Sequence, residues 1–535
     1  MLLSIQMKLK KELKSFFKGE VFDSNQKLTQ YSRDASLFEV KPQLITCPKN
    51  SSDLKKLVTF VSKRKGLSLT GRAGGSDMTG GPLTESIVVD FKHFNKIKKI
   101  GKTFAIVEPG VYYRDFEKKA KKKGLLFPSY PASKNLCAWG GMVSNNAGGE
   151  KTLAYGKTED YIQELKVILA DGQQYTFKDL NKTELAKKIK QQDFEGRVYK
   201  RMYSLIKNNK SLIEKAKPQV SKNSSGYYLW NIWDGQTFNL ANLFVGSQGT
   251  LGLITEIKVG LIKPKKHSKL LVIFLNDLKP LGKIVNEILK YNPESFESYD
   301  DNTLKLGMRY LFWKFAFQFL PELGMILQGG LPQLVLIAEF TGDSIDEVDQ
   351  KAFAAQQDIA HFKLPTRITK NAKETAKYWT VRRESFNLLR QKIKDKQTAP
   401  FIDDIVVQPE KLPQFLPQLK KILNKYDITY TIAGHVGNGN FHIIPLMNLA
   451  DKKSGQIITE LSKKVYDLVF KFDGSMSAEH NDGLIRTPFM QKMYGRKMYQ
   501  LFKETKKIFD PNNIFNPGKK VDGKLSYAIK HLKKK

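Results

Sequence analysis

The sequence predicts an α+β protein of two main domains, and three observations support this prediction. At 535 residues and 41% hydrophobic content, the chain can bury a sizeable core and divide into two or three domains. Residues 40–264 contain short β-type runs, many glycines and a few helical stretches. After a lysine-rich break near residue 264, helices and strands alternate over 265–518. We therefore predict one domain over 40–264 and a second over 265–518, flanked by a basic leader (1–39) and a basic tail (519–535).

Individual elements follow from local composition. We expect a basic leader helix over Lys8–Lys18, and then β-type runs at Ser86–Asp90 and Leu165–Gly172, with helices at Ser52–Arg64 and Arg114–Lys123. In the second domain, the alternating helices and strands are predicted at Leu278–Leu289, Leu334–Phe340, Ile345–Gln357, Gln456–Phe470 and Phe489–Phe509. The tail after Lys519 is polar and is expected to be loose.

The composition excludes several classes of protein. Two cysteines, Cys47 and Cys137, rule out a disulfide framework, a cysteine-rich zinc site and a cysteine-ligated iron–sulfur cluster within this chain. The net charge of +36 comes mainly from dispersed lysines. It fits a solvated surface or attraction to an anionic membrane, whereas nucleic acid is not expected because no binding motif accompanies it. Met1–Met7 is too short for a secretory signal, so we expect a cytoplasmic protein, peripheral at most on the inner membrane face.

One segment, Arg309–Leu320, is densely aromatic and ends at Pro321. As a helix it would place its polar residues on one narrow stripe, with apolar and aromatic side chains over the rest of its circumference. No run of 18 uninterrupted apolar residues exists in the chain, so a membrane-spanning helix is not predicted. A buried helix of the second domain and an interfacial membrane helix both fit this segment.

Two short motifs hold three of the seven histidines: Gly434–His442 and Ser477–His480. The first motif reads as a hairpin, because Asn438-Gly439 is a strong two-residue turn signal between two β-type runs. Such a turn pairs His435 with His442 on one face, with Cβ atoms about 5 Å apart. Two imidazoles at that distance can share a divalent metal, and Glu479 would complete three protein ligands with a position left open for substrate.

Three glycine-rich stretches occur in the first domain. The first is Gly71–Gly81, whose consecutive backbone N–H groups can form a nest for a pyrophosphate. The second runs through Pro128–Ser133 and Gly140–Gly149, and the third is Phe244–Thr255. No G-x-G-x-x-G pattern lies between a strand and a helix, and Lys151 stands where a Walker A loop needs its first glycine. A Rossmann site and an ATPase loop therefore lack their signatures.

Together these motifs resemble a known family. The three loops, preceded by Tyr31–Ser36, resemble the two-lobed FAD-binding domain of the vanillyl-alcohol oxidase/p-cresol methylhydroxylase type. The histidine motifs and Asn512–Pro517 resemble its ferredoxin-like α+β cap, the FAD-linked oxidase C-terminal domain. The combination is similar to the group of D-lactate dehydrogenase, glycolate oxidase D subunit and D-2-hydroxyglutarate dehydrogenase.

The resemblance implies a set of cofactor-binding residues. The first loop would wrap the FAD pyrophosphate, and the other loops and the C-terminal motif would line the rest of the cofactor. Relatives with covalent flavin carry a histidine at the place of Ser76, so a non-covalent FAD is implied. The implied cofactor-binding residues are Arg72, Gly74, Gly75, Ser76, Asp77, Ser133, Gly140, Gly141, Asn145, Gly148, Gly149, Gly252, Ile254 and Asn516.

The resemblance also implies the catalytic residues. It makes His435, His442 and Glu479 the metal ligands, with zinc the expected metal, and it makes His480 the base. Arg382, three residues after Trp379, would grip the substrate carboxylate, with Arg383 as the alternative.

Some positions depart from the family pattern. Phe386 and Ile402 stand where D-2-hydroxyglutarate enzymes carry a threonine and a lysine, which disfavours recognition of a second carboxylate. Gln248 and Asn481 replace a usual glutamate and glycine.

The implied reaction is oxidation of a D-2-hydroxy acid to the 2-oxo acid. D-lactate is the first expectation for the substrate, followed by D-2-hydroxyglutarate and glycolate. The metal would act as a Lewis acid, His480 would take the hydroxyl proton at its ordinary pKa near 6.5, and hydride would pass to FAD. Electrons would then pass to a quinone or a separate electron-transfer protein. The alternatives are a flavin oxidase of another alcohol that uses oxygen, and a non-enzymatic basic protein on the same fold that binds membrane or nucleic acid.

Overall fold

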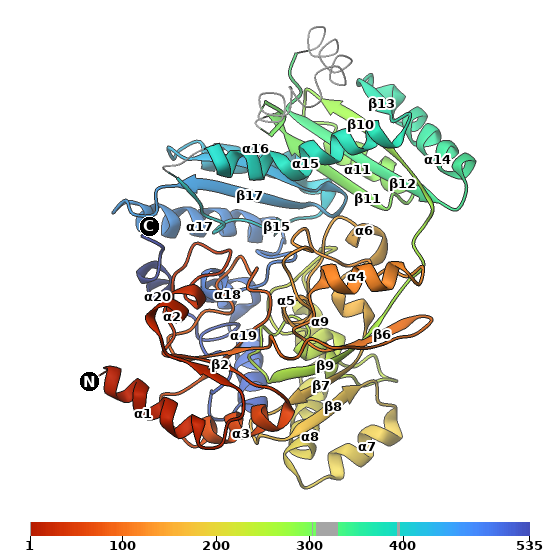
Figure 1. Ribbon diagram of the computed structural model, residues 1–535. Helices are drawn as coiled ribbons and strands as arrows, with labels where there is room; N and C mark the ends of the chain where they lie inside the picture. Colours follow the sequence, from red (N-terminus) through yellow and green to blue (C-terminus); the bar gives the residue numbers. More distant parts are fainter. Residues whose placement is uncertain (1, 302, 306–329, 393–395, 535) are drawn as a thin grey trace.

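The computed structural model describes residues 2–301, 303–305, 330–392 and 396–534 (Figure 1). The aromatic segment Arg309–Leu320 lies outside these residues, so both of its interpretations stay predictions. Across the described helices, none combines the length and the apolar character needed to cross a membrane.

The first lobe is a four-stranded sheet of order β1-β2-β4-β3, in which β2, β4 and β3 run parallel. Helix α3 (Ser51–Ser62) buries Leu54, Leu57 and Val61 in the same core as the sheet, and the side chain of Asn50 caps its first turn. Strand β3 leads directly into the first glycine loop. The strands are β1 (Glu20–Phe22), β2 (Leu44–Cys47), β3 (Leu69–Arg72) and β4 (Ile87–Asp90).

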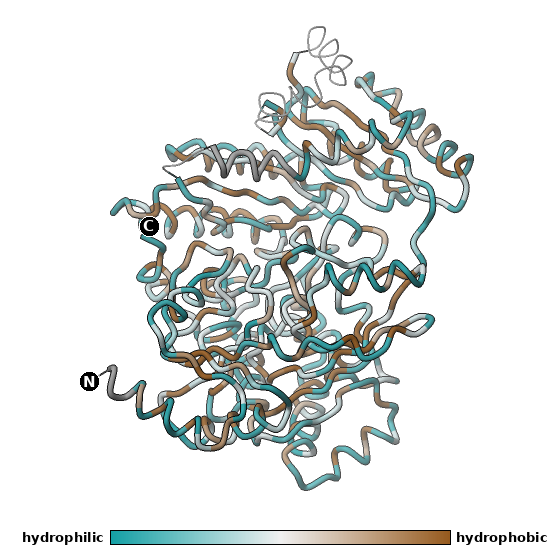
Figure 2. Tube along the Cα trace, viewed as in Figure 1, coloured by the Kyte–Doolittle hydropathy of each residue, from teal (hydrophilic) through white to brown (hydrophobic). Residues whose placement is uncertain are grey.

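The second lobe is a five-stranded antiparallel sheet of order β5-β6-β9-β7-β8. Figure 2 shows hydrophobic colouring gathered on the central strands of this sheet, while the peripheral helix α7 is hydrophilic. The strands are β5 (Ile97–Ile100), β6 (Phe104–Val107), β7 (Ile162–Ile168), β8 (Gln174–Lys178) and β9 (Leu253–Gly260). The main helices are α4 (Tyr113–Lys121), α5 (Trp139–Asn145), α6 (Thr152–Tyr155), α7 (Lys182–Lys190), α8 (Phe194–Asn208), α9 (Lys210–Ala216) and α10 (Ala241–Phe244).

The cap is built on one antiparallel sheet of order β13-β10-β12-β11-β16-β17-β14, with β15 paired to β17. Its central strands are buried on both faces. Side chains such as Leu271 and Ile273 share a core with α11, α14, α16 and α17, whereas Leu270 and Val272 pack with Tyr378 of α15. Phe296 of β11 points into the first of these cores, and successive residues of a strand point to opposite faces. Glu297 therefore lies on the same face of the sheet as α15.

The elements of the cap are β10 (His267–Leu275), α11 (Leu281–Leu289), β11 (Ser295–Asp300), β12 (Leu334–Gly342), α14 (Ile345–Asp358), β13 (Thr366–Ile368), α15 (Ala372–Lys392), β14 (Gln397–Thr398), β15 (Ile405–Val406), α16 (Leu412–Leu423), β16 (Thr429–His435), β17 (Asn440–Met447) and α17 (Ser454–Lys471).

The C-terminal segment does not stay in the cap. Helix α19 (Met490–Phe509) packs against α8 and α9, and Leu69 of β3 donates its N–H to the carbonyl of Ile514. The predicted loose tail is folded over 519–534: Lys519 and Lys520 are buried, α20 (Leu525–Lys530) follows, and Lys533 bonds to Leu37. The predicted leader helix is α1 (Leu2–Lys14), and Leu9 and Leu13 anchor it to the first lobe.

Candidate active site

The histidine hairpin forms, but in a different register from the predicted one. His435 pairs with Asn440 and His442 pairs with Ala433, so the predicted two-residue turn at Asn438-Gly439 is wrong. The loop instead spans 436–439, where Gly439 (φ 68°) closes a short 3₁₀ turn by donating to the carbonyl of Val436.

Contacts outside the hairpin explain the longer loop. A Cβ on Gly439 would lie 1.8 Å from the carbonyl oxygen of Val407, so the loop is pressed against a neighbouring strand. The side chain of Asn438 bonds Ser221 instead of closing a tight turn. The observed register differs from the predicted one by two residues, so each side chain stays on the face of the sheet that was predicted for it. His435 and His442 are diagonal neighbours on one face, with ring centroids 5.2 Å apart.

Each of these two histidines is oriented by a buried carboxylate. His435 Nδ1 lies 2.6 Å from Glu297 Oε1, and His442 Nδ1 lies 3.1 Å from Asp403 Oδ1. An ionised carboxylate can only accept, so both Nδ1 atoms donate and both Nε2 atoms are left to bind. This pairing is the usual support for a metal-binding histidine.

Glu479 brings a third donor to the same point. Its Oε1 lies 3.4 Å from His435 Nε2, and candidate ligand atoms of His435, His442 and Glu479 all lie within 4.8 Å of one another. Two imidazole nitrogens and one carboxylate oxygen form the donor set of a zinc site with an open position. The residues therefore fit a divalent metal.

The loop that carries Glu479 is fixed by Asp404. One oxygen of this buried carboxylate accepts from Ser477 Oγ at 2.8 Å, from Glu479 N at 2.8 Å and from His480 N at 2.7 Å. The fully buried Lys222 lies 2.5 Å from Glu479 Oε1. Although burial alone would raise the pKa of Glu479, Lys222 and His435 hold it well below its ordinary value. Glu479 is therefore ionised and ready to bind a cation.

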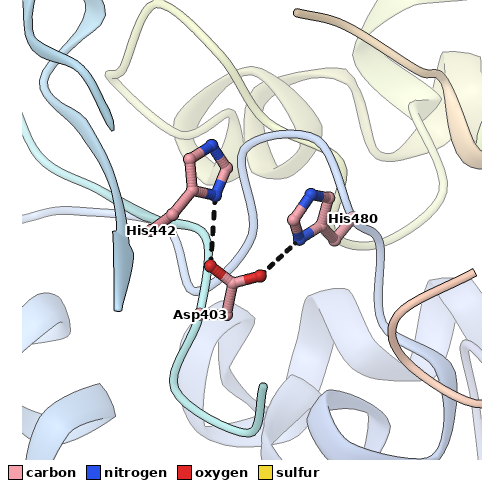
Figure 3. A group of neighbouring side chains, drawn as sticks. All are labelled: Asp403, His442 and His480. Atoms are coloured by element: carbon pink, nitrogen blue, oxygen red, sulfur yellow. Dashed lines mark hydrogen bonds and ion pairs between the residues drawn. The ribbon is translucent and has the colours of Figure 1, made fainter. Parts of the chain in front are cut away.

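His480 lies beside the metal donors. Its Nδ1 is 2.7 Å from Asp403 Oδ2, and its ring stacks on His442 with centroids 5.1 Å apart (Figure 3). Burial lowers its pKa, but Asp404 and Asp403 more than offset burial and raise the pKa to about 9. This direction differs from the expected ordinary value, and a positive charge bound nearby would lower the pKa of His480 again.

The two candidate arginines of α15 differ in their surroundings. Arg382 is partly buried, with Nη2 3.0 Å from Glu297 Oε2, and its buried Nε has no hydrogen-bond partner among the residues that the structure describes. Arg383 is half exposed and pairs with Glu150 at 2.7 Å. A buried, unpaired N–H is costly unless a ligand accepts from it, so Arg382 Nε is a candidate donor to an anion in the cavity.

A single cavity of about 880 Å³ connects these groups to the glycine loops. That volume suits a large bound ligand. Arg382, His435, His442, Glu479 and His480 line one part of it. The predicted cofactor residues on its wall are Arg72, Gly74, Gly75, Ser76, Asp77, Ser133, Gly140, Gly141, Asn145, Gly148, Gly149, Gly252 and Ile254.

The shape of the cavity depends on its glycines. Gly75 has φ 67°, and a Cβ on Gly149 would lie 2.2 Å from the carbonyl oxygen of Tyr130. A Cβ on Gly141 would meet nothing within 4 Å, so it would project into open space in the cavity wall. Bare backbone thus lines the cavity and leaves room for a dinucleotide, and the residues fit FAD.

Three predicted cofactor residues form hydrogen bonds that hold the glycine loops in place. One oxygen of Asp77 accepts from the backbone of Thr79 and Gly81, and its other oxygen accepts from Asn145 at 2.8 Å. Asn516 is not on the cavity wall; its buried amide donates to the carbonyls of Gly81 and Gln248 and so ties the first loop to the third.

Three residues of the site carry no local signal in the sequence. Glu297, Asp403 and Lys222 are buried acids and bases without a motif, and each acts on a partner distant in the chain. No local pattern could have found them. The pairing of a histidine with a distant carboxylate is visible only once the sheet is assembled.

Comparison with known proteins assigns the class. Residues 42–178 match the FAD binding domain, and residues 264–520 match the C-terminal domain of FAD linked oxidases. The fold is similar to that of p-cresol methylhydroxylase, with a TM-score of 0.66 and 15% identity over 94% of this chain and 93% of that one. The two matched domains and the fold confirm the predicted fold class, an FAD-binding domain followed by an FAD-linked oxidase C-terminal domain.

Several enzymes are similar to this chain in sequence. The chain is 27% identical to D-2-hydroxyglutarate dehydrogenase of Pseudomonas putida over 94% of its own length and 51% of the relative. It is 25% identical to glycolate oxidase subunit GlcD of Bacillus subtilis, covering 93% of each. It is 27% identical to D-lactate dehydrogenase of Anaerostipes hadrus, covering 84% and 82%. The chain thus combines an FAD binding domain with the C-terminal domain of FAD linked oxidases. It spans about half the length of the D-2-hydroxyglutarate dehydrogenases it matches first.

Proposed function

We propose that this chain is an FAD-dependent dehydrogenase that oxidises a D-2-hydroxy acid to the 2-oxo acid, with non-covalent FAD and a divalent metal, expected to be zinc. One observation carries the proposal. The donors of His435, His442 and Glu479 converge on the FAD cavity beside the unpaired N–H of Arg382. A cation next to a free guanidinium edge suits a ligand that has a hydroxyl and a carboxylate on neighbouring carbons.

Each residue of the site has its own role in the proposed reaction. Arg382 binds and orients the substrate carboxylate, and Glu297 holds its guanidinium from the other side. His480 accepts the proton of the substrate hydroxyl through Nε2, because Nδ1 is occupied by Asp403. The metal, when bound by His435, His442 and Glu479, would supply Lewis-acid chemistry that makes the hydroxyl more acidic and lowers the pKa of His480. FAD, held by the glycine loops, would supply the hydride acceptor.

D-lactate is our first proposed substrate, ahead of D-2-hydroxyglutarate and glycolate. The relatives include enzymes named for all three acids, each at 27% identity or less, so identity alone does not choose among them. Ile402 is fully buried and cannot offer a cation to a second carboxylate. A monocarboxylate fits this position better than a dicarboxylate.

For the reduced flavin we propose a quinone or a separate electron-transfer protein as acceptor. For the location we propose the cytoplasm, with the net charge of +36 favouring association with an anionic membrane surface. Anaerobic mixing of the purified protein with D-lactate, D-2-hydroxyglutarate, glycolate and L-lactate tests the proposal. Bleaching by D-lactate is expected. Bleaching by none of the acids, or only by an unrelated alcohol, would reject it in favour of the oxidase or non-enzymatic alternatives.

A further inference from the structure

The carboxylate of Asp403 lies between the rings of His442 and His480 (Figure 3). Its Oδ1 is 3.1 Å from His442 Nδ1, and its Oδ2 is 2.7 Å from His480 Nδ1. Asp403 is fully buried, and each of its oxygens faces one of the two rings. A single carboxylate therefore serves a candidate metal ligand and the candidate base together.

This arrangement fixes which nitrogen of each ring carries hydrogen. An ionised carboxylate has acceptors only, so a ring nitrogen that faces it at close range must carry hydrogen. His442 Nδ1 donates to Oδ1, and His480 Nδ1 faces Oδ2 as an ion pair whose angle lies outside hydrogen-bond geometry. In the neutral ring the other nitrogen, Nε2, then carries a lone pair. His442 needs that lone pair to bind a metal, and His480 needs it to take a proton.

The neighbouring acids cannot take over this task. Asp404 directs one oxygen to the backbone of residues 479–480 and to Ser477, and its other oxygen accepts from Asn440. Glu297 is committed to His435 and Arg382. Arg486 bonds the main-chain carbonyl of Asp403, so it holds the backbone and leaves the carboxylate to the histidines.

We propose that Asp403 is a positioning residue that sets the hydrogen-bonding state of two histidines at once, His442 for the metal and His480 for proton removal. The role of His480 rests on the proposed function; the role of His442 concerns metal binding alone.

Asp403→Asn is a sharp test, because it keeps the size of the side chain and changes one acceptor into a donor. The amide oxygen can serve only one ring, while the NH₂ group faces the other ring and forces its Nδ1 to accept. That second ring then carries hydrogen on Nε2 and loses its function. Either His442 no longer binds metal well or His480 no longer acts as a base.

The measurements separate these two outcomes. Zinc affinity is measured by titrating metal-depleted, FAD-containing protein in competition with a chelator. The rate of flavin reduction and the half-saturating substrate concentration are measured anaerobically on zinc-loaded protein. We expect zinc affinity to fall about 10–100-fold, or the saturated rate to fall on the order of 10²–10⁴-fold with half-saturation unchanged.

Two variants serve as matched controls. Glu297→Gln can still accept from His435 through its oxygen, but turns an NH₂ group toward Arg382. It should raise the half-saturating concentration instead of lowering the saturated rate. Asp473→Asn makes the same chemical change on an exposed side chain paired with Lys411, and should leave zinc affinity and rate at wild-type values.

Wild-type zinc affinity together with a wild-type rate in Asp403→Asn would overturn the proposal, as would a rise in half-saturation alone. If the Asn variant does not retain FAD, Asp403→Ala replaces it, with lower zinc affinity and rate expected. If no hydroxy acid reduces wild-type flavin, the proposed function fails. In that case only weaker zinc binding upholds the role of Asp403, and unchanged binding overturns it.

Discussion

Arg382→Lys should weaken substrate binding by an amount that the structure allows to be estimated. Lysine keeps the positive charge but lacks the planar fork, so it cannot hold Glu297 and the substrate carboxylate at once. The Nε–H now left unpaired is the donor that a substrate carboxylate would accept. A hydrogen bond to a charged group is worth about 1.5–3 kcal/mol. Its loss corresponds to a rise of roughly 10–150-fold in the half-saturating substrate concentration.

The assay is anaerobic stopped-flow reduction of the flavin over a range of D-lactate concentrations. Arg383→Lys is the matched control, because Arg383 is half exposed, pairs with Glu150 and lies over the ring of Trp379. An exposed pair contributes about 0–1 kcal/mol, so the control should change half-saturation less than about fivefold. Greater damage from Arg383→Lys than from Arg382→Lys would refute our assignment of the two faces of α15.

Three further predictions test other parts of the account. His435→Ala and His442→Ala should each remove the metal, seen by mass spectrometry, while FAD content survives because the glycine loops lie in the other domain; loss of FAD in both would contradict this. Acid precipitation should release the flavin into the supernatant, since Ser76 replaces the tethering histidine, and flavin retained in the pellet would show a covalent bond. Burial lowers the pKa of Lys519 from 10.5 to about 8 against the opposing charges of Asp34 and Asp77. Between pH 8 and pH 10.5 the unfolded chain holds the Lys519 proton more tightly than the folded protein does. The free energy of unfolding of the wild type, measured in urea relative to that of Lys519→Met, should therefore rise by up to about 3 kcal/mol from pH 8 to 10.5. The same wild-type-minus-variant difference at both pH values would count against this prediction.

Local patterns in the sequence predicted much of the architecture. Helices such as Ser51–Ser62 and Ile345–Asp358 begin and end within three residues of their predicted bounds. Glycine-rich runs and a histidine hairpin are local features, and the structure brings them around one cavity. The hairpin register was mispredicted because Val407 and Ser221, which are distant in sequence, shape the loop.

The charge network of the site could not be predicted in the same way. Glu297 is 138 residues from His435, and Lys222 is 257 residues from Glu479. Only the packing of β11 beside β16, and of the second lobe against the 477–480 loop, brings these pairs together. Asp404 and Asp403, which lie more than 70 residues before His480, likewise raise its pKa, which the ordinary value for histidine did not anticipate.

Metal dependence of flavin reduction tests the central claim most directly. The purified protein is depleted of metal with a chelator, divided, and one half is reloaded with zinc before anaerobic addition of D-lactate to both. Our account predicts rapid bleaching of the visible flavin absorbance in the zinc-loaded half, and slow or absent bleaching in the depleted half although it holds the same FAD. Equal rates in the two halves would contradict the metal-assisted mechanism, and no bleaching in either half would contradict D-lactate as the substrate.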